Sequence, residues 1–146
     1  MVFQTKVIVV RFLNLRGQVK FKNIEKNRVK WDGDSKSKFQ KSVRDFLRPY
    51  WDNDVVFEEM PLVGTRLRLD FYNSSKKLGV EVQGAQHSKY NSHFHGNRNG
   101  FRRSLERDSK KEEWCEINKI KLIEIFPEDL KRLSKEWILS EFGVYL

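Results

Sequence analysis

Two acidic residues, Asp70 and Glu81, have a spacing that predicts a shared chemical role. Apolar and polar residues alternate on both sides of a turn-like segment at 73–77, so residues 66–87 are expected to form a β-hairpin. Pairing that is symmetric about the turn places Asp70 directly opposite Glu81, with Cβ atoms roughly 5 Å apart. Carboxylates this close repel each other, and Mg²⁺, a shared proton or a nearby arginine must neutralise them. The alternative is that both acids are solvated surface charges.

The two faces of this hairpin would set the surroundings of the acids. One face carries apolar side chains, and the other carries Asp70 and Glu81 with further polar residues. The same register places Phe71 opposite Val80. It also places Arg68 opposite Gln83. The apolar face comprises Leu67, Leu69, Phe71, Leu78, Val80 and Val82, and the polar face adds Arg66, Arg68, Gly79 and Gln83.

A segment without hydrophobic periodicity, residues 84–100, follows the hairpin directly. A loop of this length inside a compact domain is usually functional or disordered. It holds all 3 histidines of the chain, and its basic and aromatic residues suit contact with nucleic acid. The pair His93-x-His95 is a weak zinc signature, because two further ligands at a usual spacing are missing.

The composition indicates one basic domain. The chain has 146 residues and a formal net charge of +9, which favours an acidic partner, most simply nucleic acid. A single cysteine, Cys115, excludes an internal disulfide and a cysteine-rich zinc site. No apolar run reaches roughly 18 residues and no signal-peptide pattern opens the chain. We therefore expect a soluble protein of the reducing cytoplasm.

The first 33 residues are markedly basic, with eight Lys or Arg against two Asp or Glu. Strands are expected over 5–13 and 18–24, and the resulting basic β-hairpin could lie in a DNA groove or along phosphates. It could equally be an edge hairpin whose solvated lysines prevent aggregation. The Asp-Gly-Asp at 32–34 marks the predicted boundary between this extension, 1–33, and a core domain, 34–146. The candidate DNA contacts of the hairpin are Arg11, Arg16, Lys20 and Lys22.

The core domain is expected to begin with an amphipathic helix over 35–50. Asp34 or Ser35 is its predicted N-cap, and Pro49 is expected to end it. A short strand should follow at 54–60. Its two glutamates are expected to be surface charges, although either could face the acids of the hairpin. The predicted buried stripe of the helix comprises Phe39, Val43, Phe46, Leu47 and Tyr50, with Gln40 and Arg44 beside it.

Another helix is expected over 101–118. Asp108 falls on its apolar stripe, which includes Cys115, and is expected to face inward. Lys111 and Glu112 are expected to be ordinary charges of the helix surface. The stripe also contains Phe101 and Leu105.

The C-terminal part predicts a strand over 121–126 and a last helix from Pro127. The strand is apolar on both faces, which indicates a central position in a sheet. The element order is a β-hairpin and then α-β-β-β-α-β-α, so an α/β fold with a mixed sheet between helices is expected. The last helix should bury Leu130, Leu133 and Trp137.

The residues around the predicted pair of acids resemble the motif of a known family. Asp70, ten residues and then Glu81-Val82-Gln83 are similar to the PD-(D/E)XK nuclease signature, in the variant where glutamine replaces lysine. The continuation GAQH at 84–87, with Arg107-Asp108 and Lys111, resembles the EDxHD group of phage homing endonucleases. That group is similar to the very-short-patch repair endonucleases, and it implies the cytoplasm of the host cell if a phage encodes the protein. The resemblance covers about residues 35–126 and implies a restriction-endonuclease-like α-β-β-β-α-β core with the N-terminal hairpin as an extension.

The resemblance also implies roles for individual residues. Asp70, Glu81 and the backbone carbonyl of Val82 would hold Mg²⁺, with Mn²⁺ as a substitute. Gln83 would orient a water or the phosphate without supplying charge, and His87 would be a general base. Asp108 matches the last acid of the pattern, and Gln40 stands where its leading glutamate is expected. Further DNA contacts are expected from Arg66, Arg68, Lys89 and Arg98.

The function implied by the resemblance is metal-dependent hydrolysis of phosphodiester bonds in double-stranded DNA by a site-specific homing endonuclease. Cleavage of both strands by one small active site favours a homodimer with two-fold symmetry. The first alternative is a structure-selective nuclease that acts on Holliday junctions or mismatches. The second is a nucleic-acid-binding module without catalysis, in which Asp70 and Glu81 are surface charges.

Overall fold

Two β-sheets and three α-helices form the framework of the part of the chain that the structure describes. The computed structural model describes residues 7–84 and 98–146, without the side chains of residues 98–105 and Asp108. The strands are β1 (Val9–Leu13), β2 (Val19–Asn23), β3 (Val56–Pro61), β4 (Arg68–Asn73), β5 (Leu78–Val82) and β6 (Lys121–Ile125). The helices are α1 (Lys38–Trp51), α3 (Arg98–Ile117) and α4 (Lys135–Phe142), with short 3-10 turns at η1 (Glu25–Asn27) and η3 (Pro127–Arg132).

The larger sheet has four strands in the order β3-β4-β5-β6, and β1 pairs with β2 in a separate two-stranded sheet. Strands β3, β4 and β5 are antiparallel, and β6 runs parallel to β5. The predicted mixed α/β fold and its element order are therefore confirmed. The expectation that 121–126 forms a central strand was wrong, because β6 lies at one end of the described sheet. Helices rather than a further strand account for its buried residues.

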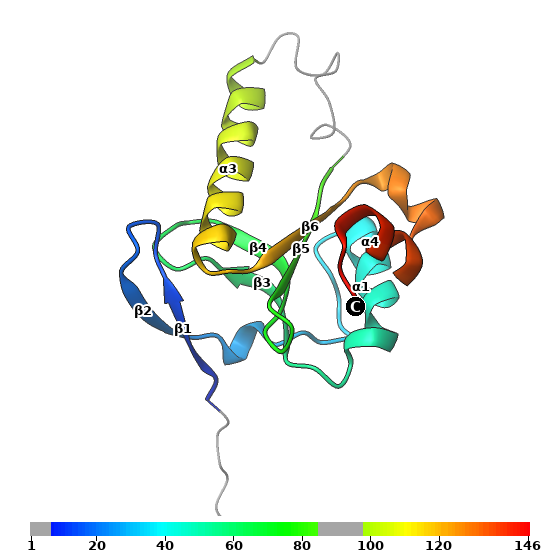
Figure 1. Ribbon diagram of the computed structural model, residues 1–146, viewed down its shortest axis with the longest axis horizontal. Coiled ribbons are helices and arrows are strands. Elements are labelled where there is room, and N and C mark those ends of the chain that lie inside the picture. The colour runs from blue at the N-terminus through cyan, green and yellow to red at the C-terminus, as the bar shows by residue number, and fades with distance from the viewer. Residues whose placement is uncertain (1–6, 85–97) are drawn as a thin grey trace, which may run out of the picture.

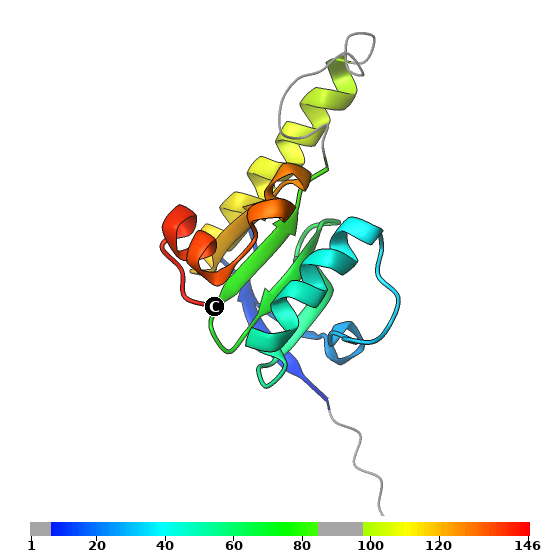
Figure 2. The same cartoon turned by 90° about the vertical axis from the view of Figure 1, so that its right-hand side faces the viewer.

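Two hydrophobic cores lie on opposite faces of this sheet, and Figures 1 and 2 show the helices on its two sides. Helices α1 and α4 cover one face, where Val43, Leu47 and Trp51 pack against Phe71 and other sheet residues. Helix α3 and the β1–β2 hairpin cover the other face. Each face therefore has its own helical layer, which fixes the strands from both sides.

The N-terminal hairpin is held by packing and by hydrogen bonds. Phe12 is buried and contacts the rings of Tyr72 and Trp114, with centroids 5.8 and 4.9 Å away. The backbone N–H of Leu13 donates to Asn118 Oδ1 over 2.7 Å. The two strands predicted over 5–13 and 18–24 are confirmed as the shorter strands β1 and β2. The domain boundary at 32–34 stays a prediction.

The predicted register of the central hairpin is confirmed, since Phe71 pairs with Val80. The predicted faces are only partly correct. Val80 lies in the core under α1 together with Phe71, whereas Leu69 lies in the opposite core. The alternation of side chains is therefore interrupted at Asp70. The interruption coincides with Glu59 on the neighbouring strand, whose φ of 55° lies in the left-handed region.

Helix α1 differs at both ends from the expectation. Its N-cap is Ser37, whose hydroxyl accepts the N–H of Gln40 over 3.0 Å, and not Asp34 or Ser35. Pro49 lies inside the helix. Because proline lacks only its own N–H, the last turn still closes through the bond from Asp52 N to Arg48 O. The expected burial of Tyr50 was wrong, since this residue is 37% exposed.

The C-terminal segment forms two short helical elements in place of the single predicted helix. Asp129 accepts the backbone N–H of Phe126 over 2.9 Å and so begins η3, and Ser134 caps α4 by accepting the N–H of Trp137. Two separate caps explain the break between them. Leu130 is exposed, contrary to the expectation, whereas Leu133 and Trp137 pack against the core.

Candidate active site

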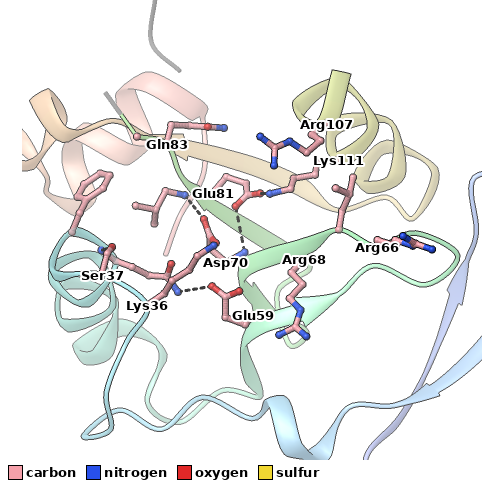
Figure 3. A pocket seen from close by; sticks show the side chains of 15 residues that line it. Lys36, Ser37, Glu59, Arg66, Arg68, Asp70, Glu81, Gln83, Arg107 and Lys111 are labelled. Carbon is pink, nitrogen blue, oxygen red and sulfur yellow. Dashed lines mark hydrogen bonds and ion pairs between the residues drawn. The ribbon is translucent and has the colours of Figure 1, made fainter. Parts of the chain in front are cut away.

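A cavity of about 560 Å³ opens where β4 begins and β5 ends, between the start of α1 and the middle of α3 (Figure 3). Its floor holds the two acids whose pairing the sequence predicted. Cationic side chains surround them, from β4, from α3 and from the segments that precede α1 and β4. The lining residues with polar or charged side chains are Lys36, Ser37, Gln40, Glu59, Arg66, Arg68, Asp70, Glu81, Gln83, Arg107 and Lys111.

The two acids stand side by side because of the register of β4 and β5. The ladder ends at Phe71 and Val80, and the next position along it brings Asp70 alongside Glu81. Beyond this pair, hydrogen bonds from backbone N–H groups to the two carboxylates replace the backbone–backbone hydrogen bonds of the ladder. Val82 N–H donates to Asp70 Oδ2 over 2.8 Å, and Asp70 N–H donates to Glu81 Oε2 over 3.3 Å. Both carboxylates are thereby fixed to the backbone, a geometry that solvated surface charges would not show.

The environment of Glu81 disfavours its charge. The residue is 3% exposed, and burial is the largest cause that raises the pKa of its carboxyl, to about 9, followed by the hydrogen bond and the charge of Asp70. Lys111 Nζ contacts Glu81 Oε1 and acts in the opposite direction. The expectation that Lys111 is an ordinary surface charge was wrong, because α3 directs it onto the sheet.

The chemistry of this pair fits a hard divalent cation. Mg²⁺ prefers carboxylate and water oxygens, and proteins commonly hold it with one or two carboxylates while the substrate phosphate supplies others. Among the residues that the structure describes, no three His, Cys, Asp or Glu side chains converge on one point. Asp70 and Glu81 would therefore be the two side-chain ligands from the described chain, and the Val82 carbonyl is adjacent in sequence.

Gln40 occupies a central place in a polar network at the start of α1. It is 3% exposed, and its Nε2 donates to Glu58 Oε2 over 2.9 Å and to Glu59 Oε1 over 3.1 Å. Arg44 is fully buried and pairs with Glu58 over 3.3 Å. On sequence grounds, either glutamate of this strand could face the site. Glu59 lines the cavity, whereas Glu58 is engaged by Arg44.

The structure brings together five of the predicted catalytic and metal-binding residues, namely Gln40, Asp70, Glu81, Val82 and Gln83. The predicted DNA contacts Arg66 and Arg68 line the same cavity and are exposed. His87 and Lys89 lie outside the described residues, as do the side chains of Asp108 and Arg98. No placement is therefore assigned to these four side chains.

Three residues that were not predicted to be catalytic, metal-binding or DNA-binding also line the cavity, namely Lys36, Glu59 and Arg107. Arg107 and Lys111 are four residues apart, which places them on one face of α3. That spacing was the available signal for both. Glu59 had no such signal, because its orientation depends on a backbone conformation that glutamate rarely adopts.

The predicted DNA contacts of the N-terminal hairpin lie outside the cavity. Arg11, Arg16 and Lys20 are exposed, and Lys22 is half-buried. A Cβ atom added to Gly64 would lie 2.9 Å from Asn14 Cβ, so the β1–β2 turn lies against the turn that leads into β4. The basic hairpin is thus attached on the side of the cavity that carries Arg66 and Arg68.

Comparisons with known proteins find viral relatives. Uncharacterized protein 033L of Invertebrate iridescent virus 3 is 34% identical over 101 residues, which are 69% of this chain and 48% of that protein. Uncharacterized protein 307L of Invertebrate iridescent virus 6 is 46% identical over 59 residues, or 40% of this chain and 30% of that protein. Uncharacterized protein 094L of Frog virus 3 is 46% identical over 66 residues, or 44% and 43%.

The chain spans less than half the length of each of these relatives. No family model matches the chain, and no solved structure matches it. Within the described residues, no helix is both long enough and apolar enough to cross a membrane. The functional argument therefore depends on the site itself.

Proposed function

We propose that the protein is a Mg²⁺-dependent endonuclease that hydrolyses phosphodiester bonds in double-stranded DNA. The observation that carries this proposal is the buried pair of Asp70 and Glu81, which is fixed by backbone N–H groups on the floor of a cavity rimmed by cations. A site with adjacent anionic and cationic zones suits a ligand that brings both a divalent cation and a phosphate. A phosphodiester with its metal ion is such a ligand.

The two charge zones would have separate tasks. Bare carboxylates repel a phosphate, so an anionic substrate approaches this floor only when a cation neutralises Asp70 and Glu81. The cavity is lined by Lys36 from the segment before α1, by Arg68 from β4 and by Arg107 from α3. These side chains would bind the flanking phosphates by charge-assisted hydrogen bonds. The cation itself would polarise the scissile phosphate and lower the pKa of a bound water when it is present.

The other residues of the site would position these groups. Val82 N–H restrains the Asp70 carboxylate, and Lys111 restrains Glu81. Gln83 is 7% exposed and lines the cavity, where its amide would orient a water or a phosphate oxygen by hydrogen bonds. We carry His87 into the proposal as a general base on the basis of the resemblance.

Outside the cavity, the proposal assigns DNA backbone contacts to the N-terminal hairpin. Its exposed cations adjoin the Arg66 side of the cavity, and binding through phosphates should weaken steeply with salt. We also propose the restriction-endonuclease-like topology, a homing-type target and a homodimer that cuts both strands. The observed element order and mixed sheet support the topology, and the viral relatives fit an enzyme that works in a host cytoplasm.

Plasmid cleavage by the wild type and by Asp70→Asn, with Mg²⁺ or EDTA, tests this function. Asparagine keeps an acceptor for Val82 N–H and removes the charge, so the fold should persist while cleavage is lost. Asp45→Asn is the matched control, since Asp45 is an exposed acid on α1 that pairs with Lys41. The proposal is supported if the wild type and Asp45→Asn cut the plasmid only with Mg²⁺ and Asp70→Asn does not cut it. DNA binding by all three proteins without cutting, on plasmid and on branched DNA, favours a binding module.

A further inference from the structure

Glu59 has a backbone conformation that the β-sheet around it does not require. Its neighbours pair regularly with β4, Glu58 with Phe71 and Met60 with Leu69. Between them Glu59 has a φ of 55°, in the left-handed region. A residue with a Cβ atom reaches this region only at a free-energy cost, and such residues gather at functional sites. Glycine would be the ordinary choice at this position.

The consequence of this conformation is a change in the direction of the side chain. Successive residues of a regular strand point to opposite faces of the sheet. Gln40 Nε2 nevertheless donates to the carboxylates of both Glu58 and Glu59. The left-handed residue therefore brings the second carboxylate to the same helix as the first. Figure 3 shows the Glu59 carboxylate directed into the cavity below Asp70.

The two neighbouring glutamates have different surroundings. Glu58 is satisfied within the fold, because it accepts from Ser35 and Gln40 and pairs with the buried Arg44. Glu59 accepts from Gln40 and makes no ion pair with any residue that the structure describes. Its half-buried charge thus faces the cavity that holds Asp70.

We propose that Glu59 is a positioning residue of this site, which orients the water ligands of a divalent cation held by Asp70 and Glu81. This inference depends on the proposed function. Glu59, Asp70 and Glu81 do not converge tightly enough to bind one ion directly, so the carboxylate of Glu59 would accept hydrogen bonds from metal-bound water. Gln40 fixes that carboxylate by its amide. Mg²⁺ suits such an arrangement, because it keeps several of its waters in protein sites.

The competing explanation is that Glu59 serves only the fold, through its bond to Gln40. Two substitutions separate the explanations. Glu59→Gly removes the carboxylate and also relieves the left-handed backbone, so the metal-free variant should melt at the same temperature as the wild type or higher. Glu59→Gln keeps the size and an acceptor for Gln40 and removes only the charge.

The experiment is isothermal titration with Mn²⁺, supported by thermal melting in EDTA. Residues that orient metal ligands typically contribute about 10-fold or more to affinity, so both Glu59 variants should bind Mn²⁺ about 10-fold more weakly. Asp45→Asn, an exposed acid on α1, should bind like the wild type. Wild-type affinity in both Glu59 variants overturns the inference. A lower melting temperature of Glu59→Gly with unchanged affinity also overturns it, in favour of a structural role.

Asp70→Asn in the same titration distinguishes failure of this inference from failure of the proposed function. If the wild type binds Mn²⁺ and Asp70→Asn does not, the metal site exists and the Glu59 variants decide the inference alone. If the wild type and Asp70→Asn give the same titration curve, the metal site itself is absent. The proposed function then fails together with the role of Glu59.

Discussion

Replacing Glu81 by glutamine should change how the stability of the metal-free protein depends on pH. Burial and Asp70 raise the pKa of Glu81 to about 9 in the folded protein, against an ordinary value of 4.5. Between pH 4.5 and about pH 9, Glu81 keeps its proton in the folded protein and releases it in the unfolded protein. The contribution of Glu81 to stability is therefore full below about pH 4.5, and it is lost progressively as the pH rises towards 9. Glu81→Gln removes this dependence because an amide does not titrate.

The expected magnitude follows from the number of protons involved. One proton that is bound in the folded state and released in the unfolded state changes the free energy of unfolding by about 1.4 kcal/mol per pH unit. From pH 6 to pH 8 the wild type should therefore lose roughly 3 kcal/mol through this residue. Mg²⁺ should compete with the proton for the carboxylate. It should stabilise the wild type more at pH 8 than at pH 6, and it should stabilise Glu81→Gln far less at either pH.

Urea unfolding at pH 6, 7 and 8, in EDTA and in Mg²⁺, measures both effects. Comparing the two proteins cancels the titration of the groups that do not interact with Glu81. Glu113→Gln serves as the control, because Glu113 is an exposed acid on α3. Parallel plots of unfolding free energy against pH for the wild type and Glu81→Gln would refute the reasoning. That result would mean that Glu81 is ionised in the folded state across this range.

Three further variants test other parts of the structure. Arg44→Met leaves Glu58 without its buried partner, so urea unfolding should show a loss of about 3–5 kcal/mol; a loss below about 1 kcal/mol would contradict the ion pair. Changing Arg16 and Lys20 together to glutamine should weaken DNA binding and lower the salt slope by about 2, which binding at several salt concentrations measures. Gly64→Ala introduces a Cβ atom at a φ of 84° and 2.9 Å from a side-chain carbon of the β1–β2 turn. Thermal melting should show a lower melting temperature, and an unchanged one would contradict that contact.

The parts of the site that could be predicted are those set by local rules. The period of two on each side of a polar turn fixes the register of β4 and β5, and this register alone brings Asp70 to Glu81. The stripe of α1 similarly predicted that Val43 and Leu47 are buried, and that Gln40 lies near them. In each case the signal came from residues close together in the sequence.

The parts that could not be predicted depend on packing between distant segments. Helix α3 has a narrow apolar stripe that includes the buried Cys115, with charged residues on both sides of it. Its sequence therefore does not reveal which of these charged residues meets the sheet, and the spacing of Arg107 and Lys111 does not identify Glu81 as the partner of Lys111. The end of α1 was misplaced for a related reason. A proline in the last turn removes one hydrogen bond, and the burial of Trp51 favours continuing the helix past Pro49.

The arrangement of acids across the sheet is the strongest reason to expect a ligand there. The registers of β3, β4 and β5 place Glu59, Asp70 and Glu81 at one level on three adjacent strands. Like charges at neighbouring positions destabilise a sheet, and apolar residues of similar size would stabilise it. Each acid is held by a different group, namely the amide of Gln40, the backbone N–H of Val82 and the ammonium of Lys111. Folding alone does not explain why three acids, each with its own stabilising contact, lie at one level of the sheet. Binding of a cation and a phosphate explains it.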